Sequence, residues 1–147
     1  MTTSEKGLAE LLRKVGYSEK AVDYYMKKLN VGVIEGVEGV DSYGGPCGDS
    51  MRIYLKVEDG VIRDAKFEAQ GSAGTFASGS AVTEMIKGKT LRQAGKITEY
   101  AVLEDIGKLP AQWHSGPSLA IDALRKSIER SQYDKSWTTL GKRYVKR

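Results

Sequence analysis

Residues 51–70, MRIYLKVEDGVIRDAKFEAQ, contain two runs of alternating apolar and polar side chains separated by a short turn. The alternate residues that are apolar in the first run are Met51, Ile53, Leu55 and Val57. The second run repeats the pattern with Ala65, Phe67 and Ala69. Between the runs, Asp59-Gly60 is a dipeptide typical of a tight hairpin turn. The stretch therefore predicts an antiparallel hairpin with one buried face.

Helical patterns lie on both sides of this hairpin. Before it, apolar residues recur every three or four positions between Ser4 and Met26, with a break at Gly16 and a predicted N-cap at Ser18. Residues 31–43 are rich in valine and glycine and predict a strand or an extended loop. The helices expected after the hairpin are 73–87, 91–94 with Thr90 as its cap, 100–106, and a last one from Ser118 to Arg130. This order predicts an α+β fold in which a small antiparallel sheet of about three strands packs against helices.

The composition fits one domain, residues 1–147, that can bury a core. It is 40% hydrophobic and 29% charged, which excludes a disordered chain. No apolar run is long enough to cross a bilayer and the N-terminus has no signal-peptide pattern, so we expect a cytoplasmic protein without a membrane partner. Residues 1–20 are expected to form a helical extension and residues 131–147 a basic tail. We expect this basic end to be solvated rather than to bind nucleic acid.

The single cysteine of the chain lies in GGPCGDS, residues 44–50. It cannot form an internal disulfide, and a turn is an unusual place for a cysteine that only fills a core. Gly48 allows the chain to turn so that Cys47 and Asp49 face the same point, and a sulfur–oxygen pair suits zinc or iron. Because metal sites usually have four ligands, the pair alone leaves three interpretations open: a metal corner, a reactive thiol, or neither.

Two further turns carry side chains that could bind or react. GSAGT, residues 71–75, precedes a predicted helix, so Ser72 is either its N-cap, which we favour, or part of an anion site at the helix N-terminus. WHSGPS, residues 113–118, contains His114, the only histidine of the chain. Its imidazole could bind a metal or transfer a proton, although a lone histidine is more often structural. A thiol enzyme with Cys47 as nucleophile and His114 as base is the weakest interpretation, because no enzyme signature surrounds the cysteine.

Taken together and in this order, the three turns resemble the scaffold family of iron–sulfur cluster assembly, of the NifU N-terminal and IscU type. The resemblance runs from residue 21 to about residue 130. Its markers in this sequence are residues 30–32, 46–51, 60–67, 77–80, 83–84, 87–89, 109–110, 119–120 and 123–124. The resemblance implies a SufE/NifU-like fold, a small antiparallel sheet packed against helices, which agrees with the pattern described above.

The family assembles a [2Fe–2S] cluster on three cysteines with an aspartate and a histidine nearby, and the resemblance assigns these positions here. Cys47 corresponds to the first cysteine, Asp49 to the aspartate, and Ser72 to the second cysteine. The histidine corresponds to Ser115 without a gap and to His114 with a slip of one residue. A serine hydroxyl is a hard donor that loses its proton far less readily than a thiol. One chain therefore offers fewer ligands than a [2Fe–2S] cluster takes.

The resemblance thus implies a scaffold of iron–sulfur cluster assembly that is not an enzyme. We expect iron or zinc at Cys47, Asp49 and His114, with Ser72 and Ser115 beside them, or a [2Fe–2S] cluster shared across a homodimer. The expected partners are a cysteine desulfurase or other iron–sulfur assembly proteins. The alternative is an adaptor or regulator of the same machinery that keeps the fold and binds no cluster.

Overall fold

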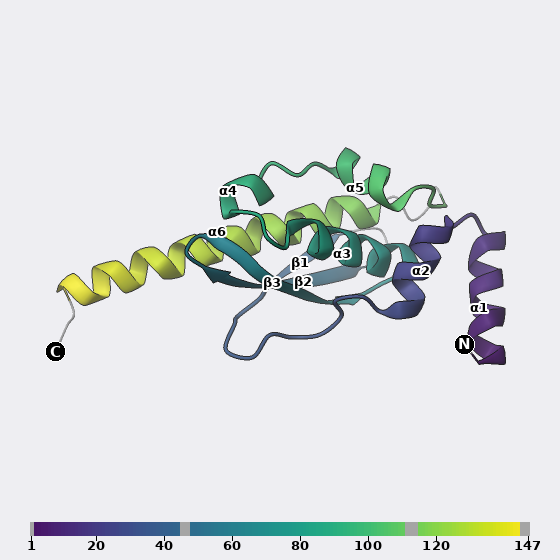
Figure 1. Ribbon diagram of the computed structural model, residues 1–147, viewed down its shortest axis with the longest axis horizontal. Helices are drawn as coiled ribbons and strands as arrows, with labels where there is room; N and C mark the ends of the chain where they lie inside the picture. Colours follow the sequence, from purple (N-terminus) through teal and green to yellow (C-terminus); the bar gives the residue numbers. More distant parts are fainter. Residues whose placement is uncertain (1, 45–47, 111–114, 145–147) are drawn as a thin grey trace.

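The computed structural model describes residues 2–44, 48–110 and 115–144, with side chains up to residue 132. The elements in chain order are α1 (Thr3–Lys14), α2 (Glu19–Lys27), β1 (Val40–Gly44), β2 (Asp49–Glu58), β3 (Val61–Gln70), α3 (Ala73–Ile86), α4 (Leu91–Ala94), α5 (Glu99–Ile106) and α6 (Ser115–Tyr144). Helices, the strands of one sheet, and helices again follow one another along the chain (Figure 1). This order confirms the α+β fold that the sequence predicts.

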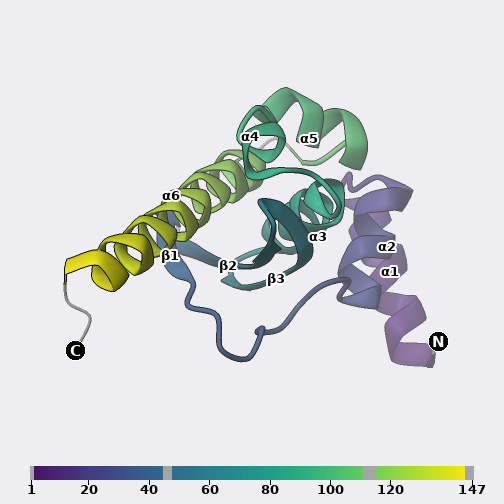
Figure 2. The same cartoon turned by 60° about the vertical axis from the view of Figure 1, so that its left-hand side comes forward.

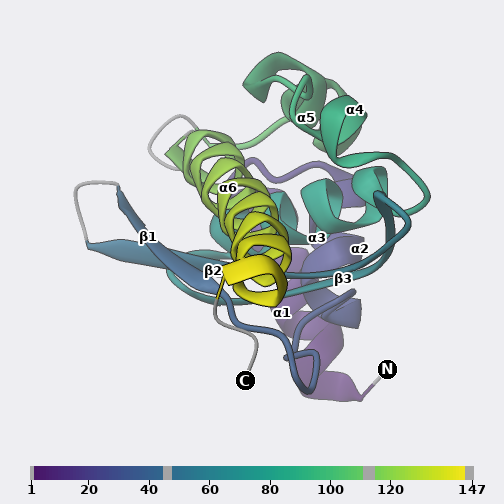
Figure 3. The same ribbon diagram turned by 90° about the vertical axis from the view of Figure 1, so that its left-hand side faces the viewer.

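β2 and β3 form the predicted antiparallel hairpin, in which Ile53 lies opposite Phe67. Asp59 and Gly60 in the turn both have positive φ, 54° and 75°, as a type I′ turn requires. β1 pairs with the other side of β2, so the strand order is β1-β2-β3. The hairpin therefore forms the centre and one edge of the sheet, and β1 forms the other edge (Figure 3).

A β-bulge changes the register near the closed end of the hairpin. Lys56 pairs with Asp64, but its neighbour Val57 pairs with Ile62, so Arg63 is an extra residue in β3. The bulge turns Ile62 into the core, where it is fully buried. Simple alternation would place this isoleucine on the outer face, and for that reason the sequence pattern does not predict it as a core residue.

At each edge of the sheet, another part of the chain contacts the backbone of the edge strand. At β1, the Lys126 ammonium of α6 donates a hydrogen bond to the Asp41 carbonyl oxygen at 3.4 Å. Beside β3, Val31 forms a parallel bridge with Phe67. Residues 31–43 are predicted from the sequence to be a strand or an extended loop. Only residues 40–43 of this segment belong to β1, and Val31 makes the single bridge to Phe67. The chain between α2 and β1 therefore adds no further strand among the described residues.

α3 and α6 cover one face of the sheet and lie side by side on it (Figure 2). The fully buried side chains between these layers include Met51, Ile53, Ile62, Phe67, Val82, Ile86, Ile121 and Leu124. α3 also packs against α2 and α5, so most of its residues are buried and Glu84 stays exposed. A helix in this position must be small or apolar over most of its surface, and the sequence of α3, AGTFASGSAVTEMI, meets that requirement with Glu84 at its exposed position.

Three helices begin at the caps that the sequence predicts. Ser18, Ser72 and Thr90 each accept a hydrogen bond from a backbone N–H in the first turn of α2, α3 and α4. At each start the hydroxyl satisfies an amide that has no partner within the helix.

The prediction for the last helix is wrong at both ends. α6 begins at Ser115 rather than after Ser118, and it continues past Arg130 to Tyr144. Pro117 does not prevent the earlier start, because an amide hydrogen in the first turn would have no intrahelical partner to lose. Residues 131–144, predicted as part of a basic tail, are helical. No helix in the described ranges has both the length and the apolar run needed to cross a membrane.

Tyr24 joins α2 to α5. Its hydroxyl donates to the Asp105 carboxylate at 2.7 Å, and Lys20 contacts the other oxygen of that carboxylate at 2.6 Å. Burial, and next the hydrogen bond to Asp105, raise the pKa of Tyr24 above the ordinary tyrosine value. The neutral phenol is therefore part of the contact between the two helices.

Replacing Tyr24 by phenylalanine tests this contact. We expect Tyr24→Phe to lower the free energy of unfolding at neutral pH by about 0.5–1.5 kcal/mol, because one hydrogen bond is lost. A raised folded-state pKa means that the contribution is complete below the ordinary pKa and disappears as the pH rises above about 10. Urea unfolding across this range should show a steeper loss of stability for the wild type than for the variant. Parallel curves would contradict the assignment.

Gly79 tests the close packing of α3. A Cβ at this position would overlap the ring of Phe67, so we expect Gly79→Ala to lower the free energy of unfolding by about 1–3 kcal/mol. Gly7 of α1 is a matched control, because an added Cβ there meets nothing within 4 Å. Gly7→Ala should raise the free energy of unfolding by up to about 1 kcal/mol through helix propensity alone. Equal effects of the two changes in urea denaturation would exclude the packing argument.

Candidate functional site

Three segments that are far apart in the sequence meet at one end of the sheet. The Thr75 hydroxyl, in the first turn of α3, donates to the Asp49 carboxylate at the start of β2, with 3.0 Å between the oxygens. The first turn of α6 lies against the same turn of α3: a Cβ on Gly116 would be 2.8 Å from the Gly74 carbonyl oxygen. The parts of the three predicted turns that the structure describes therefore converge.

Asp49 is the carboxylate of this site and is only 7% exposed. Its one hydrogen bond within the described part of the chain comes from Thr75, which is 1% exposed. Gly71 makes room for the pair, since a Cβ there would lie 2.9 Å from Asp49 Oδ2 and 2.6 Å from Thr75 Oγ1. A side chain at position 71 would displace the carboxylate or the hydroxyl.

Ser72 performs the role of N-cap that we favoured from the sequence. Its Oγ accepts a hydrogen bond from the Thr75 amide at 3.4 Å. Tyr17 also reaches this turn, where burial raises the pKa of its phenol and hydrogen bonds with the Ser72 side chain and the Gly74 backbone oppose the rise. The Ser72 hydroxyl is therefore engaged with the first turn of α3.

Sequence reasoning missed Tyr17 and Thr75 as residues of this site. Tyr17 directly precedes the N-cap Ser18, the position where an apolar side chain often fixes the direction from which the chain enters a helix. Thr75 stands three residues after the N-cap Ser72, inside a run of small residues. The only sequence signal for either residue is its position close to a helix N-cap. That position does not indicate that Thr75 contacts Asp49 or that Tyr17 lies near Ser72.

The five residues predicted from the sequence divide into two groups. Asp49, Ser72 and Ser115, the first residue of α6, lie at the same end of the sheet. Cys47 and His114 lie outside the described residues. Among the side chains that the structure describes, no three His, Cys, Asp or Glu residues are grouped closely enough to hold a metal ion. The side chains of Asp49, Ser72, Thr75 and Ser115 offer oxygens at this end, and oxygens are hard donors.

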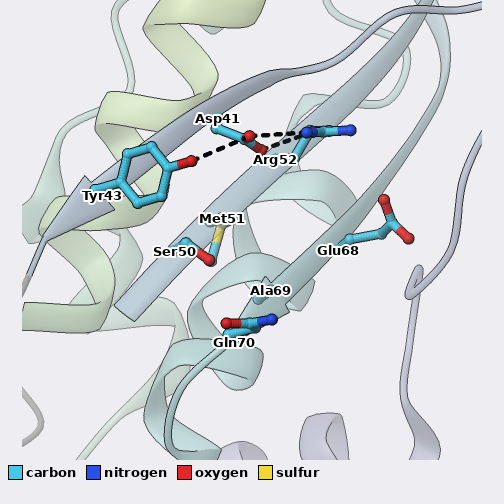
Figure 4. A pocket seen from close by; sticks show the side chains of 8 residues that line it. All are labelled: Asp41, Tyr43, Ser50, Met51, Arg52, Glu68, Ala69 and Gln70. Carbon is cyan, nitrogen blue, oxygen red and sulfur yellow. Dashed lines mark hydrogen bonds and ion pairs between the residues drawn. The ribbon is translucent and has the colours of Figure 1, made fainter. Parts of the chain in front are cut away.

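A concave surface lies on the face of the sheet turned away from the helices (Figure 4). It is a hollow of about 420 Å³. Asp41 accepts two hydrogen bonds from Arg52 at 2.7 and 2.8 Å and one from Tyr43 at 3.2 Å. The hydrogen bond from Arg52 is the main reason that the pKa of Asp41 is lowered. Because the charges of this pair offset each other, Arg52 is not a free cation for an anionic ligand, and no other lysine or arginine of the described ranges lines the hollow.

Comparison with known proteins assigns the chain to a family. The sequence model of the NifU-like N terminal domain matches residues 16–137. The iron-sulfur cluster assembly scaffold protein IscU 1 of Archaeoglobus fulgidus is 49% identical over 113 residues, which cover 76% of this chain and 74% of that protein. The iron-sulfur cluster assembly scaffold protein IscU of Escherichia coli is 38% identical over 119 residues, covering 78% and 92%.

Solved structures agree with this assignment. The N-terminal NifU-like protein of Brucella abortus has a TM-score of 0.55 at 21% identity and covers 77% of this chain and 94% of its own, which supports the fold alone. A putative iron-sulfur cluster assembly scaffold protein for the SUF system of Fervidobacterium islandicum has a TM-score of 0.52 at 26% identity, covering 80% and 96%. The chain belongs to the family of the NifU-like N-terminal domain, which includes scaffolds of the IscU type.

Gly116 tests the contact between α3 and α6 that brings the site together. A Cβ there would lie 2.8 Å from both the Gly74 carbonyl oxygen and Ser78 Oγ, which are themselves hydrogen-bonded at 2.7 Å. We expect Gly116→Ala to lower the free energy of unfolding by about 1–3 kcal/mol and to shift the amide NMR signals of the first turn of α3. Gly95→Ala is the control, because an added Cβ there makes only ordinary contacts from 3.4 Å. Unchanged α3 signals in Gly116→Ala would contradict the close approach.

Proposed function

We propose that this protein is a scaffold on which an iron–sulfur cluster is assembled before it is passed to other proteins. The observation that supports this most is the meeting of the starts of β2, α3 and α6 around Asp49 in a chain of this family. The relatives in Archaeoglobus fulgidus and Escherichia coli are scaffold proteins by name, and nothing in them favours the alternative of an adaptor without a cluster.

In this proposal the cluster is cargo, and Cys47, Asp49 and His114 are its ligands. We propose that Ser72 and Ser115 flank these ligands as oxygen donors, at positions where the resemblance implies a cysteine and a histidine. A thiolate is a strong ligand for cluster iron, whereas a carboxylate is a harder donor and holds such iron less firmly. A mixed set therefore suits a protein that must give its cargo away. The same donors also suit zinc, which would compete with iron for the site.

Three ligands are one short of the four that a [2Fe–2S] cluster takes. We propose that the missing donors come from a second copy of the chain, so that a homodimer brings two thiolates to one cluster. Sulfur for the cluster must be delivered by another protein, and a cysteine desulfurase is the class of enzyme that releases it from cysteine. We place this work in the cytoplasm, because a free thiolate needs a reducing compartment.

Anaerobic reconstitution with iron and sulfide tests the proposal. The wild type should bind both in a coloured complex, and its mass by light scattering should be that of a dimer. Cys47→Ala should lose at least about ten-fold in bound iron, because one of few ligands is removed. Asp41→Asn is the matched control, since this carboxylate lies in the hollow on the outer face of the sheet and should leave iron binding unchanged.

Each result decides a separate part of the proposal. Wild-type protein without iron and sulfide would overturn the scaffold function, and binding of a desulfurase that persists in Cys47→Ala would then favour the adaptor. Cluster binding that is equal in Cys47→Ala and wild type would remove the cysteine from the ligand set. A monomer carrying a complete cluster would exclude the shared site, and zinc in place of iron after purification would replace the proposed cargo.

A further inference from the structure

The two oxygens of the Asp49 carboxylate differ in their hydrogen bonding. Oδ2 accepts the hydrogen bond from Thr75 at 3.0 Å, whereas Oδ1 has no hydrogen-bond partner in the described part of the chain. An ionised carboxylate can accept about four hydrogen bonds, and one that is 7% exposed has little water to supply them. No fully enclosed polar side-chain atom among the described residues lacks a partner, so Oδ1 keeps some exposure. One oxygen is thus held by the protein and the other is free to bind.

The Thr75 hydroxyl has little freedom to do anything else. Thr75 is 1% exposed in the first turn of α3, and its nearest other hydroxyl is Ser72 Oγ at 3.5 Å. Ser72 Oγ is already used by the Thr75 amide, and an ionised carboxylate can only accept. The threonine proton is therefore directed to Asp49, and Gly71 leaves the space in which the two side chains meet.

The contact joins residues that are 26 positions apart on different elements. A helix start needs only an N-cap, and Ser72 already supplies one for α3. The bond from Thr75 to Asp49 therefore goes beyond what the helix requires. Its direct effect is on the carboxylate, whose plane and direction it restricts.

We infer that Thr75 is a positioning residue for the metal cargo: it holds Asp49 Oδ2 against α3 and leaves Oδ1 as the oxygen that binds iron. This inference rests on the proposed function and deepens it. With one oxygen fixed to the helix, the carboxylate binds through a single atom and not through both. Groups that orient a metal ligand in this way usually change metal affinity by about 10–100-fold when they are removed.

The test uses Co²⁺ as an iron substitute, because its visible absorption reports the ligands around the ion. Thr75→Val has nearly the shape of threonine without its hydroxyl, and Thr75→Ser keeps the hydroxyl. We expect the Kd for Co²⁺ to rise about ten-fold or more in Thr75→Val, with an altered spectrum, while Thr75→Ser retains the wild-type affinity and spectrum. Thr75→Ala provides a second variant without the hydroxyl if valine fails to fold, and thermal unfolding of each protein is measured alongside.

Wild-type affinity in Thr75→Val or Thr75→Ala would overturn the inference, as would a Thr75→Ser variant that binds as weakly as valine. A second readout does not depend on cargo. In the metal-free protein, the ¹³C carboxyl signal of Asp49 should move in Thr75→Val and stay in place in Thr75→Ser. If the wild type binds no Co²⁺ or iron, the proposed function fails, and this signal alone decides whether Thr75 holds the carboxylate. An unmoved signal excludes it.

Discussion

Most of helix α3 is buried, because the many small residues in its sequence let the neighbouring elements approach closely. The sheet, α2, α5 and α6 all approach it. Gly79 of α3 makes room for the ring of Phe67, and Gly116 of α6 lets the first turn of α6 lie against α3. Buried hydroxyls on such a helix must find partners, and Ser78 and Thr83 donate back to the helix carbonyls four residues earlier at 2.7 Å. The helix therefore brings polar groups into the interior without leaving them unsatisfied. Its N-terminal turn is then fixed at the end of the sheet where Asp49 begins β2.

The sequence predicts most of this arrangement because its signals are local. Alternation over residues 51–70 predicts the hairpin, and serine or threonine before an apolar run predicts the start of three helices. The bulge beside Ile62 is invisible to alternation, because a register shift depends on the partner strand. The start of α6 is misjudged because glycine and proline are typical of loops and are also tolerated in a first helical turn.

The residues of the candidate site also divide into those that local sequence signals predict and those that depend on tertiary packing. Asp49 and Ser72 can be selected from the sequence, since each lies in a turn of small residues and corresponds to a family position. The contact of Thr75 with Asp49 cannot be selected in this way, because it exists only after α3 has docked on the sheet. Residue type indicates which donors a chain contains, whereas their orientation is a property of tertiary packing. The resemblance implies a cysteine at position 72, where this chain has serine, and the structure adds that this hydroxyl serves as a helix cap.

Lys126 of α6, whose ammonium lies at the edge strand β1, affects how two copies of this protein can associate. An exposed strand edge invites a second sheet to join it, and an ammonium group lying over a backbone carbonyl discourages that union. At the opposite edge, Val31 already pairs with the backbone of Phe67 in β3, which an added strand would need. Association through a continuous intermolecular sheet is therefore disfavoured on both sides. Molecules at high concentration are thereby discouraged from growing into ribbons through their strand edges.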